Sequence, residues 1–227
     1  MPKHLQNAIE NLKKMVLSLS ATVEESVHKT MTSIIERDVA LAREIIEKDE
    51  EIDRREVELE EECLKILALH QPVAIDLRFI IAVLKINNDL ERIGDEAVNI
   101  AERADYLASR RRVDIAFDFS VMADKVQSML KKSLDSLVRL DSKMAGEVCA
   151  QDDEVDKMYH EVYDKVKDAI RRQPEDLGSL IHILGIARHL ERIADHATNI
   201  AEDVIYMIEG MIARHNNGIK NIWTESY

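Results

Sequence analysis

One ten-residue pattern occurs twice in this chain, and it constrains the fold more than any other feature. Residues 90–95 and 99–102 read LERIGD and NIAE, and residues 190–195 and 199–202 read LERIAD and NIAE, 100 positions later. The two copies align without a gap and differ only where Ala194 replaces Gly94. A chain that repeats such a segment at a fixed interval is best explained by the duplication of one structural unit.

Few residues in the chain interrupt a helix. Six glycines and three prolines in 227 residues leave few places to turn, and apolar residues recur at three- and four-residue spacing. Asp38 and Asp141 are the expected N-caps of the middle helix in each half. The pairs Gln71-Pro72 and Gln173-Pro174 are expected to end these helices, because proline cannot donate to the preceding turn. We expect helices over residues 4–36, 38–69, 72–109, 119–140, 141–171 and 175–214.

The sequence therefore predicts an all-α protein of two tandem three-helix bundles with six long helices, related by internal duplication. The first bundle covers residues 1–110 and the second covers residues 119–215. Residues 111–118 follow the first of three consecutive arginines and are interpreted as a charged linker, with a partner surface as the alternative. Residues 216–227 form a C-terminal tail that holds the single tryptophan, Trp223.

Charge and composition exclude several classes of protein. A formal net charge of −13 repels phosphate backbones, so we expect no nucleic-acid binding, whereas cations or a basic partner suit this surface. There is no apolar run near 18 residues and no signal peptide, which favours a cytoplasmic protein that is at most peripheral to a membrane. Cys63 and Cys149 are interpreted as small core residues and not as a disulfide.

Acidic side chains lie on one face of each repeated segment. At about 100° per residue, a carboxylate four positions after another lies one turn along the same face of a helix. A second acidic pair comes early in the middle helix of each half, at an offset of 103 residues. If the two helices pack, their carboxylates converge on a site for divalent or trivalent metal ions, which take oxygen ligands. The candidate ligands are Asp49, Asp53, Glu91, Asp95 and Asn99 in the first half and Asp152, Asp156, Glu191, Asp195 and Asn199 in the second.

Another interpretation of the acidic faces stays open at this point. The faces are solvated surface if Arg92 and Arg192 neutralise them through an intrahelical lattice of ion pairs. In that case the chain is a purely structural helical scaffold. The two acidic sites also need not be equivalent, because Tyr159 and Tyr163 stand in the second half where the first has Glu56 and Glu60.

Histidines give a weaker indication of chemistry. His182, His189 and His196 fall seven positions apart, and their counterparts in the first half are not histidines. We interpret them as interhelical or solvated residues and not as a second metal site. A ferritin-like di-metal carboxylate enzyme needs two Glu-x-x-His motifs, and Glu25 with His28 forms the only one in the chain. The sequence therefore favours a protein that is not an enzyme.

The doubled LERI[GA]D and NIAE segments, their acidic partners and the Gln-Pro breaks together resemble the PhoU family of phosphate-uptake regulators. The resemblance implies a cytoplasmic protein that often forms a homodimer and acts as a negative regulator. It implies partners as well, the phosphate ABC transporter and a sensor histidine kinase. The family's E(D)xxxD signature is associated with bound metal, iron clusters among them, and it maps onto Glu91, Asp95, Glu191 and Asp195. No basic anion pocket is evident in the sequence, so we do not expect phosphate to be bound directly.

Overall fold

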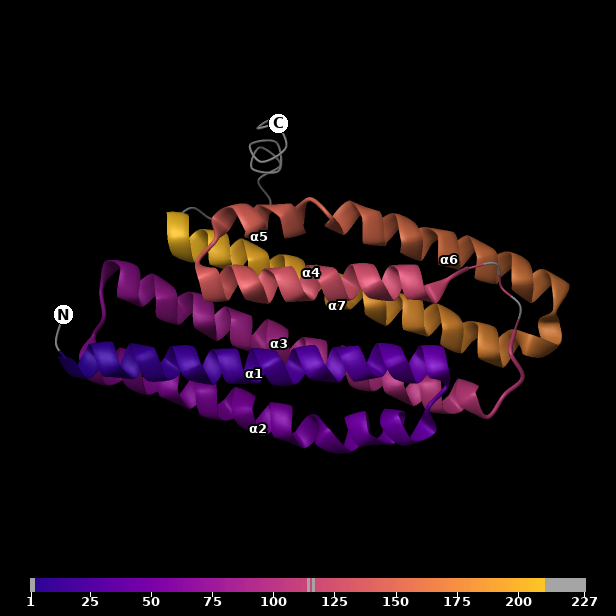
Figure 1. Cartoon of the computed structure of the whole chain (residues 1–227), viewed down its shortest axis with the longest axis horizontal. Coiled ribbons are helices and arrows are strands. Elements are labelled where there is room, and N and C mark those ends of the chain that lie inside the picture. Colours follow the sequence, from indigo (N-terminus) through magenta and orange to yellow (C-terminus); the bar gives the residue numbers. More distant parts are fainter. Residues whose placement is uncertain (1–2, 114, 116, 211–227) are drawn as a thin grey trace.

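The computed structural model describes residues 3–113, 115 and 117–210 of the chain. Within this part the secondary structure is entirely helical, and long helices follow one another with short connections (Figure 1). In chain order the elements are α1 (Lys3–Glu36), α2 (Val39–His70), α3 (Ala74–Ala108), α4 (Phe119–Arg139), α5 (Ser142–Cys149), α6 (Asp152–Arg172), the 3-10 helix η1 (Pro174–Asp176) and α7 (Leu177–Glu209).

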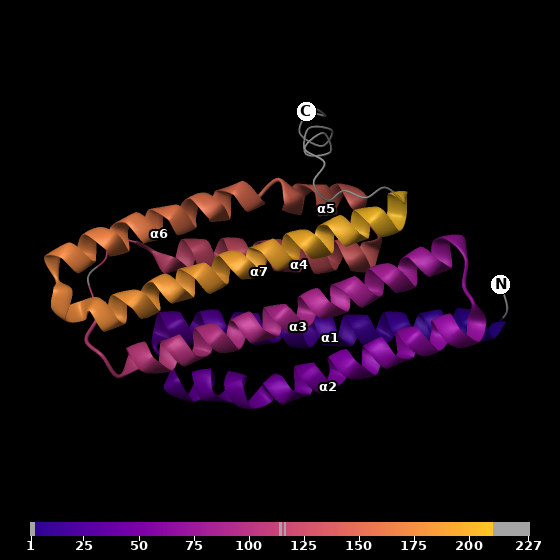
Figure 2. The same ribbon diagram turned by 180° about the vertical axis from the view of Figure 1, so that it is seen from behind.

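The helices form two elongated bundles that lie against each other (Figures 1 and 2). The first bundle consists of α1, α2 and α3, and the second consists of α4, α7 and a rod made of α5 followed by α6. Helix α3 packs along α7, and α1 packs against α4, so these four helices join the bundles. The outer rods, α2 on one side and α5 with α6 on the other, lie farthest apart. The predicted all-helical, duplicated two-bundle fold is confirmed.

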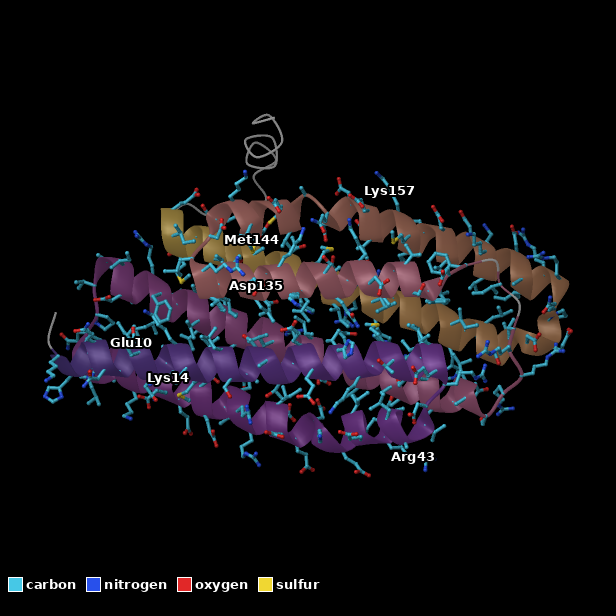
Figure 3. All side chains as sticks on the ribbon, viewed as in Figure 1. Glu10, Lys14, Arg43, Asp135, Met144 and Lys157 are labelled. Carbon is cyan, nitrogen blue, oxygen red and sulfur yellow. The ribbon has the colours of Figure 1, made fainter. Side chains whose placement is uncertain are left out.

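Apolar residues of both halves form one continuous core. The core face of α1 repeats every three or four residues, from Leu5 and Ile9 through Leu12 to Val27, as one face of a helix requires. The same core cluster continues into the second bundle as far as Met207. Charged side chains such as Glu10, Arg43 and Lys157 project from the outer surface (Figure 3). The halves are thus separate in sequence but joined in packing.

The ends of the middle rods follow the predicted signals. Asp38 and Asp141 each accept a hydrogen bond of 3.0 Å, from the backbone amides of Leu41 and Met144, which makes both of them N-caps. Helix α2 ends before Pro72, with Gln71 in the left-handed conformation at φ 45°.

The structure corrects the prediction of one unbroken helix from Asp141 to about Arg171. Helix α5 ends at Cys149, and a new helix, α6, begins at Asp152. The amides of Ala150 and Gln151 bond to carbonyls three or four residues back, which closes the last turn of α5. Three acidic residues then occupy the first turn of α6, where negative charge stabilises the N-terminus of a helix. The middle rod of the second bundle is therefore two helices.

The last helix is also shorter than the predicted range of 175–214. It begins at Leu177 after a 3-10 turn and ends at Glu209, because Gly210 adopts φ 73° and terminates the helix. The predictions for residues 211–214 and for the tail with Trp223 lie outside the described residues.

Two arginines form hydrogen bonds at the end of the first half, and one of them reaches the second half. Arg111 forms two hydrogen bonds to the carboxylate of Asp176, at 2.9 and 2.6 Å, and so ties the end of the first half to the start of α7. The guanidinium of Arg37 donates to the carbonyls of Leu107 and Arg110 at the end of α3. Both arginines therefore form hydrogen bonds within the chain.

Cys63 and Cys149 are free thiols, Cys63 buried in the core and Cys149 packed against it. No helix in the described part of the chain combines the length and the apolar character needed to cross a membrane.

Candidate metal centres

The first acidic cluster lies where α2 packs on α3. Gly94 permits this close packing, because a Cβ at this position would lie 3.2 Å from Ile52 Cδ1 and 3.6 Å from Asp49 Oδ1. Ile52 is buried, so it fixes which face of α2 turns toward α3. Asp49 therefore lies directly beside the segment of α3 that carries Glu91 and Asp95.

Carboxylates of α2 and α3 raise one another's pKa in this first cluster. Burial, followed by repulsion from Asp53 and Asp95, raises the pKa of Asp49 to about 6. Burial and repulsion from Asp53 also raise the pKa of Asp95. The pKa of Glu91 is raised by burial and by repulsion from Asp95, with smaller effects of Glu56 and Asp53. The four predicted acidic residues of the first half are therefore electrostatic neighbours, whereas among the described residues the close group of three ligand oxygens lies in the second half.

The second acidic cluster lies between α6 and α7. Asp156, Glu191 and Asp195 each offer a carboxylate oxygen, and these oxygens lie within 4.8 Å of one another. Asp152 lies at the start of α6 and accepts a 3.2 Å hydrogen bond from Thr198 of α7. Burial, followed by repulsion from Asp152 and Asp156, raises the pKa of Asp195 to about 6. The predicted acidic residues of the second half therefore also converge.

The donor set of the second cluster suits a hard cation. Three carboxylate oxygens at this spacing match the preference of such ions for several oxygen ligands. Glu191 Oε2 is buried and accepts no hydrogen bond within the described part of the structure, which is a costly arrangement that a bound cation would relieve. Asp156 is partly buried and Asp195 is exposed, so the buried carboxylate of Glu191 is what distinguishes this cluster from a solvated acidic surface.

Asn99 and Asn199 have other partners in this structure. The Asn99 side-chain nitrogen donates to the backbone carbonyl of Asp95 at 2.9 Å. The Asn199 side-chain nitrogen donates to Asp89 Oδ1 at 3.1 Å, on the other bundle. Their role as metal ligands stays a prediction.

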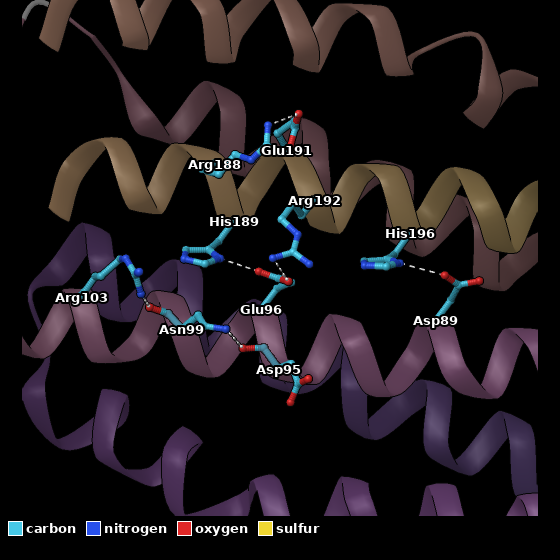
Figure 4. A network of polar contacts seen from close by, with 10 residues as sticks. All are labelled: Asp89, Asp95, Glu96, Asn99, Arg103, Arg188, His189, Glu191, Arg192 and His196. Atoms are coloured by element: carbon cyan, nitrogen blue, oxygen red, sulfur yellow. Dashed lines mark hydrogen bonds and ion pairs between the residues drawn. The ribbon is translucent and has the colours of Figure 1, made fainter. Parts of the chain in front are cut away.

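A polar seam joins α3 to α7 on the sides that face away from the two clusters (Figure 4). His189 Nδ1 lies 2.5 Å from Glu96 Oε2, and His196 Nδ1 lies 2.8 Å from Asp89 Oδ1. His182 stacks on Tyr106, with ring centroids 3.8 Å apart. The three histidines are thus interhelical.

Sequence reasoning missed this seam, although the repeat contained a signal for it. The offset of 100 aligns Asp89 with His189 and Glu96 with His196. Helices α3 and α7 run antiparallel. Glu96 therefore contacts His189, which aligns with Asp89, and Asp89 contacts His196, which aligns with Glu96. The signal in the sequence was that two acidic residues of the first copy align with two histidines of the second.

Arg192 does not form the predicted intrahelical lattice with the acidic face. Its Nη1 instead bonds Glu96 Oε1 across the seam at 2.9 Å. Arg92 donates to the side-chain oxygen of Asn88 at 3.0 Å and lies close enough to lower the pKa of Glu91 and Asp95 in part. Glu25, the acid of the single Glu-x-x-His motif, is paired with Lys29 at 2.6 Å.

Fold and site together define a class: a duplicated, all-helical protein in which each bundle carries an acidic cluster between its middle and last helices. The model of the PhoU domain matches this chain twice, at residues 16–104 and 119–204. The chain belongs to the PhoU family.

Relatives and solved structures agree with this assignment. The chain is 36% identical over 218 residues to a phosphate-specific transport system accessory protein PhoU homolog of Pseudomonas putida, covering 96% of this chain and 85% of that protein. A homolog with the same description from Aquifex aeolicus is 38% identical, covering 92% and 95%. The crystal structure of PhoU from Pseudomonas aeruginosa superimposes with a TM-score of 0.86 at 34% identity, covering 91% of this chain and 99% of that one. This family consists of accessory and regulatory proteins and not of enzymes, which argues against the ferritin-like alternative.

Proposed function

We propose that this protein is a metal-binding accessory regulator of phosphate uptake. Its relatives are described as accessory proteins of the phosphate-specific transport system, and a Streptococcus pneumoniae structure with a TM-score of 0.81 and 28% identity is described as a phosphate transport system regulatory protein. The observation that carries the metal part is the convergence of Asp156, Glu191 and Asp195, whose oxygens lie within 4.8 Å of one another.

The proposed mechanism is contact between proteins. A cation bound by carboxylates of two helices ties the middle rod to the last helix of a bundle and neutralises part of the acidic surface. The surface formed in this way docks on the cytoplasmic side of the phosphate ABC transporter and on a sensor histidine kinase. A homodimer presents two such surfaces, and the result is negative regulation of uptake and of starvation signalling.

Metal content tests the site directly. Replacing Glu91 and Asp95 together by alanine should lower the bound metal measured by elemental analysis, because both carboxylates of the last helix are lost from the first cluster. The matched control replaces Asp164 and Asp168, which have the same spacing on an exposed part of α6. Equal metal content in the two double variants would remove Glu91 and Asp95 from the site.

Calorimetric titration with metal separates the regulator from a purely structural scaffold. A regulator that uses these clusters should give heat of binding at micromolar metal. A scaffold with solvated acidic faces should give none.

Partner capture tests the regulatory role. A tagged chain should recover transporter subunits and the kinase from membranes of phosphate-replete cells, and the double variant at Glu91 and Asp95 should recover less of both. Failure of the unaltered chain to recover either protein would contradict the adaptor role while leaving the metal sites untouched.

A further inference from the structure

The two acidic clusters differ in one basic side chain. The offset of 100 aligns Arg188 with Asn88, three residues before Glu191 and Glu91. Arg188 Nη1 donates to Glu191 Oε1 at 3.0 Å (Figure 4). Asn88 instead accepts a hydrogen bond from Arg92 Nε at 3.0 Å. A guanidinium therefore touches a carboxylate of the second cluster, where the aligned residue of the first cluster is an uncharged amide.

A second difference accompanies the first. The offset of 103 aligns Tyr159 of α6 with Glu56 of α2. Glu56 lies near enough to the first cluster to raise the pKa of Glu91 by repulsion, although burial is the larger cause. The ring of Tyr159 instead lies 5.5 Å from the guanidinium carbon of Arg188, within the range of a cation–π contact. Arg92 and Arg192 also lower pKa values in the first cluster, but Arg92 is bonded to Asn88 and Arg192 to Glu96. The second cluster therefore differs in having a guanidinium hydrogen-bonded directly to one of its carboxylates and a tyrosine in place of Glu56.

We propose that Arg188 is a built-in counter-cation of the second cluster, which lowers the affinity of this cluster for a divalent cation. This inference rests on the metal sites proposed above. The positive charge of Arg188 beside Glu191 offsets the repulsion among the carboxylates of the metal-free cluster, and the same charge repels an incoming cation. The Arg188 side chain is 53% exposed, so its guanidinium can turn toward solvent when a cation takes its place.

Arg188 has a second conceivable role, in which it raises the metal affinity of the second cluster. By bonding Glu191 Oε1, the guanidinium could orient the carboxylate so that the unpartnered Oε2 binds the cation. An orienting residue raises metal affinity, whereas a counter-cation lowers it. The sign of the change on removing Arg188 therefore decides between them.

The test is a calorimetric titration of the full chain with Mn²⁺ after treatment with a chelator. The second cluster is isolated by the double substitution Glu91→Gln and Asp95→Asn, which removes carboxylate charge from the first with little change in shape. In this background, Arg188→Asn should tighten Mn²⁺ binding about tenfold, the order expected when a unit charge is removed near a divalent ion in a partly exposed site. Arg188→Lys keeps the charge and should keep the affinity of the unaltered second cluster.

The reciprocal exchange tests the first cluster. It is isolated by Glu191→Gln with Asp195→Asn, and Asn88→Arg should then weaken Mn²⁺ binding about tenfold. Far-UV circular dichroism and urea unfolding of each variant establish that the chain is folded. Tighter Mn²⁺ binding after Arg188→Asn together with weaker binding after Asn88→Arg cannot result from a general loss of stability, which would weaken binding in both variants.

Each outcome decides the inference. Unchanged or weaker binding after Arg188→Asn overturns the counter-cation role, and weaker binding would identify Arg188 as a residue that positions Glu191. If the first cluster binds Mn²⁺ and the second does not respond at Arg188, this inference fails and the proposed metal function stands. If no variant binds Mn²⁺, both fail together.

Discussion

At the scale of single residues, the carboxyl group of Asp49 binds its proton more tightly in the folded chain than in the unfolded one. Burial and the neighbouring Asp53 and Asp95 raise its pKa from 3.8 to about 6. Its contribution to stability is therefore fully present below about pH 4 and is lost as the pH rises through about 6. In metal-free protein, Asp49→Asn should raise the free energy of unfolding by about 1 kcal/mol at pH 7 and leave it nearly unchanged at pH 4.

Urea unfolding at the two pH values, with a chelator present, measures this difference. Asp164→Asn, at an exposed position of α6, is the control and should change stability little at either pH. A loss of stability at pH 7 after Asp49→Asn would mean that Asp49 makes a favourable contact as a carboxylate. If the first cluster binds metal as proposed, the same variant should also weaken the stabilisation by added metal, because Asp49 is one of the proposed ligands.

Residues of the acidic clusters could be predicted from the sequence because helical spacing alone places them on one face. Glu91 and Asp95 are one turn apart on any straight helix, and the duplication repeats the pattern. The contact between Arg188 and Glu191 also lies within one helix, but the sequence alone did not distinguish it from the expected lattice at Arg192. Which basic residue turns toward the acids depends on packing across the seam, where Arg192 is held by Glu96.

At the scale of helices, Asp141 caps a short element and so has a large effect on it. Its carboxylate accepts a hydrogen bond from the amide of Met144 at 3.0 Å, and α5 has only eight residues. Asp141→Ala should lower the free energy of unfolding by about 1 kcal/mol, since an N-terminal amide loses its acceptor. Urea unfolding followed by circular dichroism checks this loss.

Asp38→Ala should cost a similar amount, because Asp38 caps α2 in the same way. Glu58→Ala, at an exposed position in the middle of α2, is the control that removes a carboxylate but no cap. If Asp141→Ala changes stability no more than Glu58→Ala does, the cap on α5 contributes nothing measurable.

Helix termini were predicted correctly where a strong local signal was present. They were predicted wrongly between α5 and α6 and at the end of α7. Asp38, Asp141 and Pro72 are strong local signals, and the structure follows them. The apolar periodicity continues across Ala150 and Gln151, so it could not show that α5 and α6 are separate helices. The end of α7 had a local signal in the sequence, Gly210, because glycine readily adopts the positive φ that ends a helix. The predicted range of 175–214 extended past this glycine.

At the scale of the whole molecule, the duplication predicted two bundles but not how they meet. A repeat fixes the fold of each half, whereas the contact between halves depends on residues that differ between the copies. Asp89 and Glu96 in one copy, and His189 and His196 in the other, form that contact. The seam lies on the faces of α3 and α7 that turn away from the acidic clusters, so each of these two helices contributes carboxylates to an acidic cluster on one face and forms the joint between the bundles on the other (Figure 4).

Glu96 is the centre of this joint. Its side chain is 4% exposed and bonds both His189 and Arg192, at 2.5 and 2.9 Å. Burial acts to raise the pKa of Glu96, but the hydrogen bond and charge of His189, together with the charge of Arg192, hold that pKa below its ordinary value. A buried carboxylate with two such partners contributes to stability mainly because its removal leaves those partners without an acceptor.

Glu96→Gln keeps one acceptor oxygen but removes the charge and replaces the other oxygen with an NH2 group, which cannot accept from either partner. It should therefore lower the free energy of unfolding by about 2 kcal/mol, measured by urea unfolding at pH 7. Glu10→Gln is the matched control, since Glu10 pairs with Lys13 at 3.1 Å on the exposed face of α1, where an ion pair contributes about 0.5 kcal/mol or less. Because the two halves share one core, we expect Glu96→Gln to shift a single transition and not to split it in two. A loss no larger than that of Glu10→Gln would show that apolar packing alone holds α3 against α7, and a split transition would show that the bundles unfold independently.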